Sequence, residues 1–183
     1  MEERLQGNPV SEGIAYAKSY IYIPGTLTKA PDFFPKGQEE EKYREFRESC
    51  EKADSELVTL YNGMCKEDPD KAKIFSAHRE LLQDEEILDE IRETICEENM
   101  NPDSAVSKVY TEFAELLAGV EDPLIAERAA DLRDVRDRLL RILSGQETSK
   151  LSSFSEDVIL VAHDLLPSDT ATMDRKHIKG ILT

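Results

Sequence analysis

The segment Asp157-Val-Ile-Leu-Val-Ala162 is the clearest indication of the fold class of this chain. Its unbroken run of β-branched and apolar residues is typical of a parallel strand that is buried on both faces. Downstream, Pro167-Ser168-Asp169 predicts the start of a short helix, and Lys179-Gly-Ile-Leu-Thr183 predicts the next strand. These segments together predict a βαβ unit.

A second β-rich segment lies far upstream, from Gly13 to Ile23. It is rich in Ile and Tyr, with Asn8-Pro9 before it and Pro24-Gly25 after it, so it predicts a strand bounded by turns. Residues 26–37 are rich in Pro and Gly and predict a connection. Helix-forming residues dominate after this connection, which indicates a second subdomain.

The middle of the chain has helical periodicity. Apolar residues alternate at spacings of three and four from Tyr43 to Met64, which predicts a long helix packed on another. Gln83-Asp84 predicts a break, because Asp84 can cap a new helix, and Gly145 can end the last helix. Short connections place neighbouring helices antiparallel, as in an up-and-down bundle. Three helices are expected to start at an Asp or Asn followed by Pro: Asp68-Pro69, Asn101-Pro102 and Asp122-Pro123.

The predicted fold class is α+β and mostly α, with an antiparallel helical bundle inserted into a partial α/β domain. Residues 1–32 hold the first strand, residues 33–146 the helical subdomain and residues 147–183 the continuation of the α/β domain. The sequence stops within the second strand of the βαβ unit. We therefore expect the α/β domain to be cut short in this chain.

Charge and composition narrow the classes of partner. The chain has a formal net charge of −16, so nucleic acids and anionic membranes would be repelled, whereas a basic protein would be attracted. The alternative is that the charge only keeps the protein soluble. No stretch is long and apolar enough to span a bilayer, and the widely spaced Cys50, Cys65 and Cys96 match no disulfide framework. We expect a cytoplasmic protein.

Generic catalytic signatures are scarce. The sequence has no Gly-rich phosphate loop, no Cys-x-x-Cys pair and no His-Glu-x-x-His segment. The three histidines, His78, His163 and His177, are scattered, so we expect no metal site.

Four stretches together are more specific: Asn8-Pro-Val-Ser-Glu-Gly-Ile-Ala15, Lys71-Ala-Lys-Ile-Phe-Ser-Ala-His-Arg-Glu-Leu-Leu-Gln-Asp-Glu-Glu-Ile87, Glu127-Arg-Ala-Ala-Asp-Leu-Arg-Asp134 and Asp157-Val-Ile-Leu-Val-Ala-His-Asp-Leu-Leu-Pro-Ser-Asp-Thr170. In this order they resemble the N-terminal region of the Enzyme I family, the phosphoenolpyruvate-protein phosphotransferases of the bacterial sugar phosphotransferase system.

The resemblance implies a helical subdomain that binds the phosphocarrier protein HPr, inserted into a swivelling phosphohistidine domain. Family members take a phosphoryl group from phosphoenolpyruvate onto a histidine and pass it to HPr for sugar uptake. That histidine lies in a Gly-Gly-x-Thr-Ser-His motif that this sequence does not contain. The resemblance therefore implies that these residues alone are inactive and monomeric, and that phosphoenolpyruvate and Mg²⁺ bind the full-length enzyme outside them.

The resemblance also implies roles for individual residues. Thr170 would orient the phosphohistidine, and Lys71 would lie near the transferred phosphoryl group, where a cation offsets negative charge. An apolar centre with a carboxylate rim suits a basic carrier. The implied docking residues, besides Lys71, are His78, Leu81, Leu82, Glu85, Glu86 and Arg128.

Each role has an ordinary structural alternative. Leu81 and Leu82 could be core residues, Asp84 to Glu86 a capped first helical turn, and Lys71 a solvated surface lysine. The alternative for the whole chain is a non-catalytic helical adaptor that binds a basic protein through the same acidic ridge. His163 and His177 receive no role from the resemblance.

Overall fold

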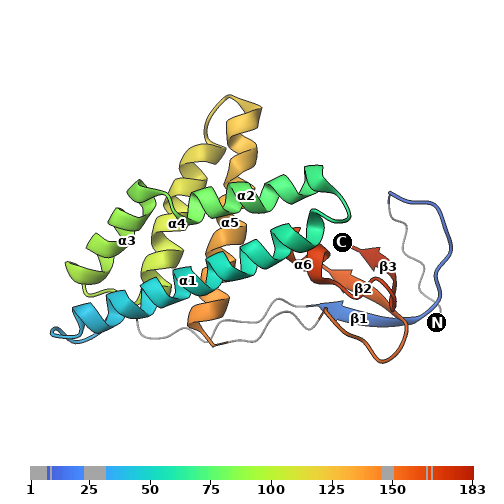
Figure 1. The fold of residues 1–183 in the computed structure, drawn as a ribbon, viewed down its shortest axis with the longest axis horizontal. Coiled ribbons are helices and arrows are strands. Elements are labelled where there is room, and N and C mark those ends of the chain that lie inside the picture. Colours follow the sequence, from blue (N-terminus) through green and yellow to red (C-terminus); the bar gives the residue numbers. More distant parts are fainter. Residues whose placement is uncertain (1–7, 9, 23–31, 146–150, 164, 166) are drawn as a thin grey trace.

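The computed structural model describes residues 8, 10–22, 32–145, 151–163, 165 and 167–183 (Figure 1). Strand β1 spans Lys18–Tyr22. Five helices follow: α1 Glu39–Met64, α2 Pro69–Leu82, α3 Glu85–Cys96, α4 Pro102–Ala118 and α5 Pro123–Leu143. The chain then forms β2 Val158–Ala162, α6 Pro167–Thr172 and β3 Ile178–Leu182.

The three strands form one parallel sheet in the order β1-β2-β3. Lys18 pairs with Val158 and Tyr22 with Ala162, although all five long helices lie between these strands in the sequence. The predicted helical insertion into an α/β domain is therefore confirmed. The first strand is shorter than predicted, since residues 13–17 are not part of it, and the turn predicted at Pro24-Gly25 lies outside the described residues.

The predicted helix starts are found at the expected positions. The Asp68 carboxylate accepts hydrogen bonds from the backbone N–H groups of residues 70 and 71, at 3.2 Å each. Asp84 caps α3 in the same way, at 3.0 and 3.2 Å, and Asp122 caps α5 at 2.9 Å. Asn101 differs because its side chain does not cap α4, although α4 still begins at Pro102. Gly145 follows α5 with φ of 66°, the left-handed conformation expected of a glycine at this position.

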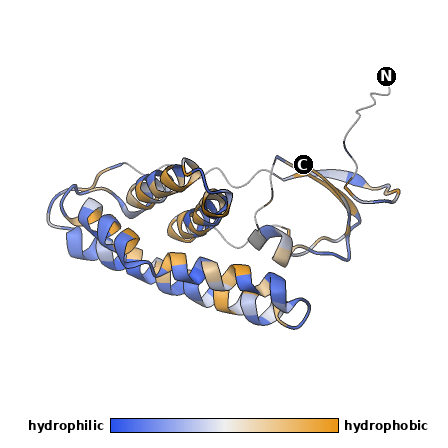
Figure 2. Cartoon of the chain, turned by 90° about the horizontal axis from the view of Figure 1, so that it is seen from above, coloured by the Kyte–Doolittle hydropathy of each residue, from blue (hydrophilic) through white to orange (hydrophobic). Residues whose placement is uncertain are grey.

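The predicted antiparallel helical bundle is confirmed, and its helices form two antiparallel pairs that cross one another. In Figure 1, α1 and α2 run along the long axis, α4 and α5 run across it, and α3 connects the pairs. The helices carry separate hydrophobic and hydrophilic sides (Figure 2). None of the described helices is long and apolar enough to cross a membrane. The shared core includes Phe46, Leu57, Phe75, Ile91, Ile95, Val109, Tyr110, Leu132 and Leu139.

The sheet is covered unequally on its two faces. Along β2, Val158, Leu160 and Ala162 are buried, whereas the two residues between them are only partly buried. The prediction of burial on both faces is therefore wrong in this structure. On the less covered face, Ile21 and Leu182 are 68% and 60% exposed, and both pair with Val161.

Helix α6 lies between the sheet and the helical part (Figure 1). Ala171 of α6 packs against the helical core. The loop after α6 adds an exposed ion pair, in which Arg175 lies 3.0 Å from Glu67. Because exposed ion pairs contribute little, the apolar contact of Ala171 is the stronger link between the two parts.

Candidate functional site

Four of the predicted docking residues are exposed on the helical part. Lys71 lies in the first turn of α2, where its ammonium group is 3.2 Å from the Asp68 carboxylate. Glu85 and Glu86 form the first turn of α3, where a negative charge is favourable beside the helix N-terminus. Arg128 is exposed on α5. The helical part therefore presents both signs of charge, with the carboxylates together at the start of α3.

Helix α2 is held against α1 by a two-point ion pair. The Arg79 guanidinium donates to both oxygens of Asp54, over 2.7 and 3.2 Å. Two parallel hydrogen bonds fix orientation as well as distance. This contact fixes the position of α2 and of the residues that it carries.

The resemblance implied that His78 and Leu82 lie on the docking surface, but both side chains are buried in the structure. Leu82 is 2% exposed and His78 is fully buried, while Leu81 is partly buried. The physical reason is helical periodicity, because residues 75, 78 and 82 lie on one face of α2, and this face packs into the core. The alternative of a core residue is thus confirmed for Leu82.

His78 instead joins α2 to α5. Its Nε2 atom lies 3.2 Å from Oδ1 of Asp131, and its Nδ1 atom lies 3.9 Å from Oδ2 of Asp134. The ring also meets Phe75 edge-on, with 6.2 Å between ring centroids. A direct contact between His78 and a partner would require α2 to move.

Apolar residues near the turn between α4 and α5 are exposed, and the sequence analysis did not identify them as site residues. Leu116 is 71% exposed and Leu124 is 76% exposed, and Ile125 is 39% exposed beside it. Leu124 and Arg128 are four residues apart on α5, so they share one face of the helix. The available signal was that Leu124 and Ile125 lie in the first turn of α5, before the buried residues of this helix begin at Ala129.

Thr170 is exposed on α6, in the crossover from β2 to β3. Asp169 precedes it and accepts a hydrogen bond from the Tyr22 hydroxyl over 3.1 Å. Lys71 and Thr170 lie on different elements, and Lys71 forms an ion pair with Asp68, the N-cap of its own helix. The structure therefore gives the two predicted catalytic residues separate surroundings.

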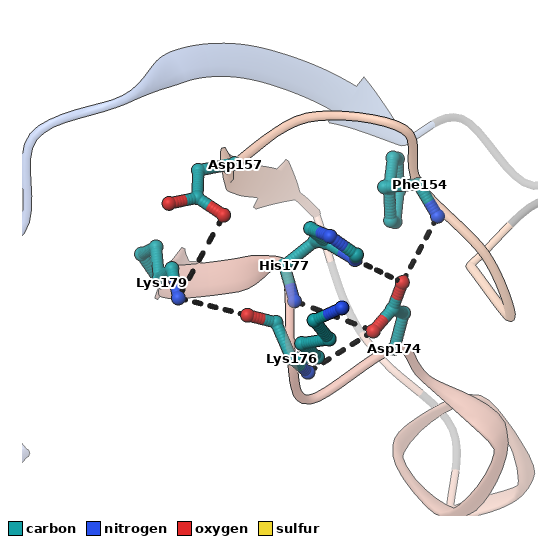
Figure 3. A network of polar contacts seen from close by, with 6 residues as sticks. All are labelled: Phe154, Asp157, Asp174, Lys176, His177 and Lys179. Carbon is teal, nitrogen blue, oxygen red and sulfur yellow. Dashed lines mark hydrogen bonds and ion pairs between the residues drawn. The ribbon is translucent and has the colours of Figure 1, made fainter.

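The start of β3 is held by the carboxylate of Asp174 (Figure 3). One oxygen accepts from the backbone N–H groups of Lys176 and His177, at 3.0 and 3.3 Å. The other lies 3.0 Å from the Phe154 nitrogen and 2.8 Å from Nδ1 of His177. The hydrogen bond with His177 and those from the backbone hold the pKa of Asp174 well below its usual range. His177 thus has a structural partner, whereas His163, beyond the end of β2, is exposed.

No three His, Cys, Asp or Glu side chains converge as metal ligands in the part of the chain that the structure describes. The cysteines are free thiols, and burial raises the pKa of Cys50 to about 12. Cys50 is therefore a core residue rather than a reactive thiol.

The architecture and the exposed face define a class: an α/β domain that carries a helical insert with exposed apolar and charged side chains. The family model for the N-terminal part of PEP-utilising enzymes matches residues 6–128. This chain belongs to that family of PEP-utilising enzymes.

Curated relatives are similar in sequence over the whole of this chain. A phosphoenolpyruvate-protein phosphotransferase of Priestia megaterium is 36% identical over 184 residues, covering 100% of this chain and 32% of the relative. One from Bacillus subtilis is 36% identical over 182 residues, covering 99% of this chain and 32% of the relative. The chain thus spans about a third of the length of these curated relatives.

Solved structures have the same fold. A solution structure of Enzyme I is 33% identical, with a TM-score of 0.77 over 90% of this chain and 67% of that one. The N-terminal domain of a second protein, described as Enzyme 1 - Nitrogen, is 23% identical with a TM-score of 0.66 and covers 90% of this chain and 67% of that one. The chain therefore corresponds to the N-terminal region of Enzyme I.

Proposed function

We propose that this chain is the carrier-docking part of a phosphoenolpyruvate-protein phosphotransferase, and that its helical insert binds HPr in the cytoplasm. The observation that carries the proposal is the likeness to these enzymes, which runs over the entire chain. The proposal extends to the function of the full-length enzyme, the passage of a phosphoryl group to HPr for sugar uptake.

The exposed side chains suit a small basic carrier. Glu85 and Glu86 supply negative charge, and Leu124 supplies an exposed apolar group on the same helix as Arg128. Buried apolar anchors contribute most of the affinity in such interfaces, whereas rim charges mainly set the association rate and its dependence on salt. Leu124 thus takes the anchoring role that the buried Leu82 cannot take.

His78 and Leu82 keep an indirect role in this proposal. His78 joins α2 to Asp131 of α5, and Leu82 lies in the shared core at the end of α2. Both residues therefore help to hold α2 in place. Leu81 is partly buried at the edge of this core.

Thr170 and Lys71 are assigned to the phosphoryl-transfer step. Thr170 orients the phosphorylated histidine through its hydroxyl, and Lys71 offsets the charge of the phosphoryl group that passes to HPr. The phosphorylated histidine, the phosphoenolpyruvate site and the Mg²⁺ site belong to other parts of the full-length enzyme. We therefore propose that these 183 residues alone do not accept a phosphoryl group.

The surroundings of two histidines support this inactivity. The His78 side chain is fully buried against Asp131, and Nδ1 of His177 is 2.8 Å from the Asp174 carboxylate. Incubation with phosphorylated HPr should leave the chain unlabelled. Acid-labile label that disappears in His163→Ala would contradict the proposal, because it would make the exposed His163 an acceptor.

A calorimetric titration with HPr tests the docking proposal. We expect weak binding that becomes weaker as salt is raised, since screening acts on exposed charges. Glu85→Gln and Glu86→Gln should weaken binding at low salt and have less effect at high salt. Absence of binding at low salt would favour the alternative, an adaptor for a different basic protein. The likeness to phosphotransferases, which includes the α/β part, argues against this alternative.

A further inference from the structure

Strand β1 and helix α6 are joined by a hydrogen bond between side chains that are far apart in the sequence. The Tyr22 hydroxyl donates to Oδ1 of Asp169 over 3.1 Å. Tyr22 is the last residue of β1 and pairs with Ala162, the last residue of β2. The bond therefore lies at the end of the sheet where the chain leaves β2 and enters α6.

The hydroxyl is a dependable donor at neutral pH. Burial and the adjacent Asp169 carboxylate raise the pKa of Tyr22 to about 12. The phenol therefore keeps its proton, and a hydrogen bond from a neutral hydroxyl to a carboxylate is stronger than one between two neutral groups. Partial burial also reduces competition from water.

Helix α6 needs such a contact because it has only six residues. Isolated helices of this length are not stable in water, so its position depends on what surrounds it. Ala171 packs against the core of the helical insert, while Asp169 is bound to Tyr22 of the sheet. Thr170, between these two anchored residues, remains exposed.

We propose that Tyr22 is a positioning residue, whose hydrogen bond to Asp169 fixes α6 and thereby the place of the Thr170 hydroxyl. Asp169 and Thr170 share a planar peptide unit, so a fixed Asp169 restricts the backbone of Thr170. This inference rests on the proposed role of Thr170 in orienting the phosphorylated histidine. It adds a residue of β1, far upstream, to the phosphoryl-transfer site.

Tyr20 provides a matched control on the same strand and the same face. Its ring packs edge-on against Phe154, with centroids 5.0 Å apart. Within the described residues the Tyr20 hydroxyl makes no hydrogen bond, in contrast to that of Tyr22. Tyr22→Phe and Tyr20→Phe therefore remove the same atom, but only the first removes a bond to α6.

The first test is NMR of the 183-residue chain, with amide hydrogen exchange of residues 169–172 and the side-chain couplings of Thr170. Tyr22→Phe should speed exchange about tenfold, the effect of losing one hydrogen bond to a charged group, and should average the Thr170 χ1 rotamers. Tyr20→Phe should change exchange less than about twofold. Asp169→Asn, which keeps an oxygen acceptor, should retain more protection than Asp169→Ala. Equal effects of Tyr22→Phe and Tyr20→Phe would overturn the proposal.

A second test separates this inference from the proposed function. It uses a longer chain that carries the phosphorylatable histidine and measures transfer to HPr together with HPr affinity. Tyr22→Phe should slow transfer about tenfold and leave the HPr dissociation constant unchanged. If Thr170→Val slows transfer and Tyr22→Phe does not, the positioning role of Tyr22 is overturned. If Thr170→Val has no effect, the role of Thr170 in the proposed function fails, and the exchange experiment still decides whether Tyr22 fixes α6.

Discussion

Replacing Leu124 by alanine should weaken HPr binding without destabilising the protein. Full burial of a leucine side chain contributes about 1.5–3 kcal/mol. Leu124 is 76% exposed in the free chain, so its burial by HPr would contribute about 1–2 kcal/mol. Loss of that contribution raises the dissociation constant about five- to thirtyfold. Alanine is a good helix former, so α5 should remain intact.

Calorimetric titration with HPr measures this change, and thermal unfolding checks that the fold is unaltered. Ile21→Ala is the matched control, because Ile21 is 68% exposed but lies on the open face of the sheet. The Ile21→Ala variant should bind HPr with the same dissociation constant as the unchanged chain. A dissociation constant for Leu124→Ala within twofold of the unchanged chain would refute the argument that Leu124 is an anchor.

Three further predictions concern stability. Leu82→Ala should lower the free energy of unfolding by about 2–5 kcal/mol in denaturant titration, because Leu82 is 2% exposed. Unchanged stability would contradict its core position. Since the pKa of Asp174 is lowered in the folded chain, its stabilising effect is complete above about pH 5 and is lost as pH falls below about 4. Asp174→Asn should flatten the pH dependence of unfolding in this range, and a dependence as steep as in the unchanged chain would count against the network in Figure 3. Amides of the three-stranded sheet should exchange faster than those of α1 and α5, because two of its strands leave apolar residues exposed; uniform protection would show that the sheet is as stable as the helical core.

The course of the chain could be predicted from local chemistry. An Asp or Asn before Pro marks a helix start whatever packs around it, because the cap and the proline ring act within one turn. This is why the starts of α2, α4 and α5 were correct to the residue, and Asp84 marked the start of α3 equally well. The apolar runs at the two ends of the chain predicted strands of one α/β domain, and the structure adds that β1 pairs with β2 in parallel.

The candidate site was less predictable, since exposure depends on which face of each helix meets a neighbour. His78 and Leu82 share a motif with Glu85 and Glu86, yet α2 turns the first two inward and α3 presents the other two. Crossing of the two helix pairs also could not be inferred, because crossing angles depend on how side chains interdigitate. The Tyr22–Asp169 hydrogen bond joins residues 147 positions apart, so no local sequence pattern could predict it.

An NMR titration of the isotope-labelled chain with HPr would map the docking surface residue by residue. We expect shifts at Lys71, at Glu85 and Glu86, and from Leu124 to Arg128, with little change on the open face of the sheet around Ile21 and Leu182. Shifts confined to the sheet, or no shifts with HPr in large excess, would contradict the claim that the helical insert is the docking surface.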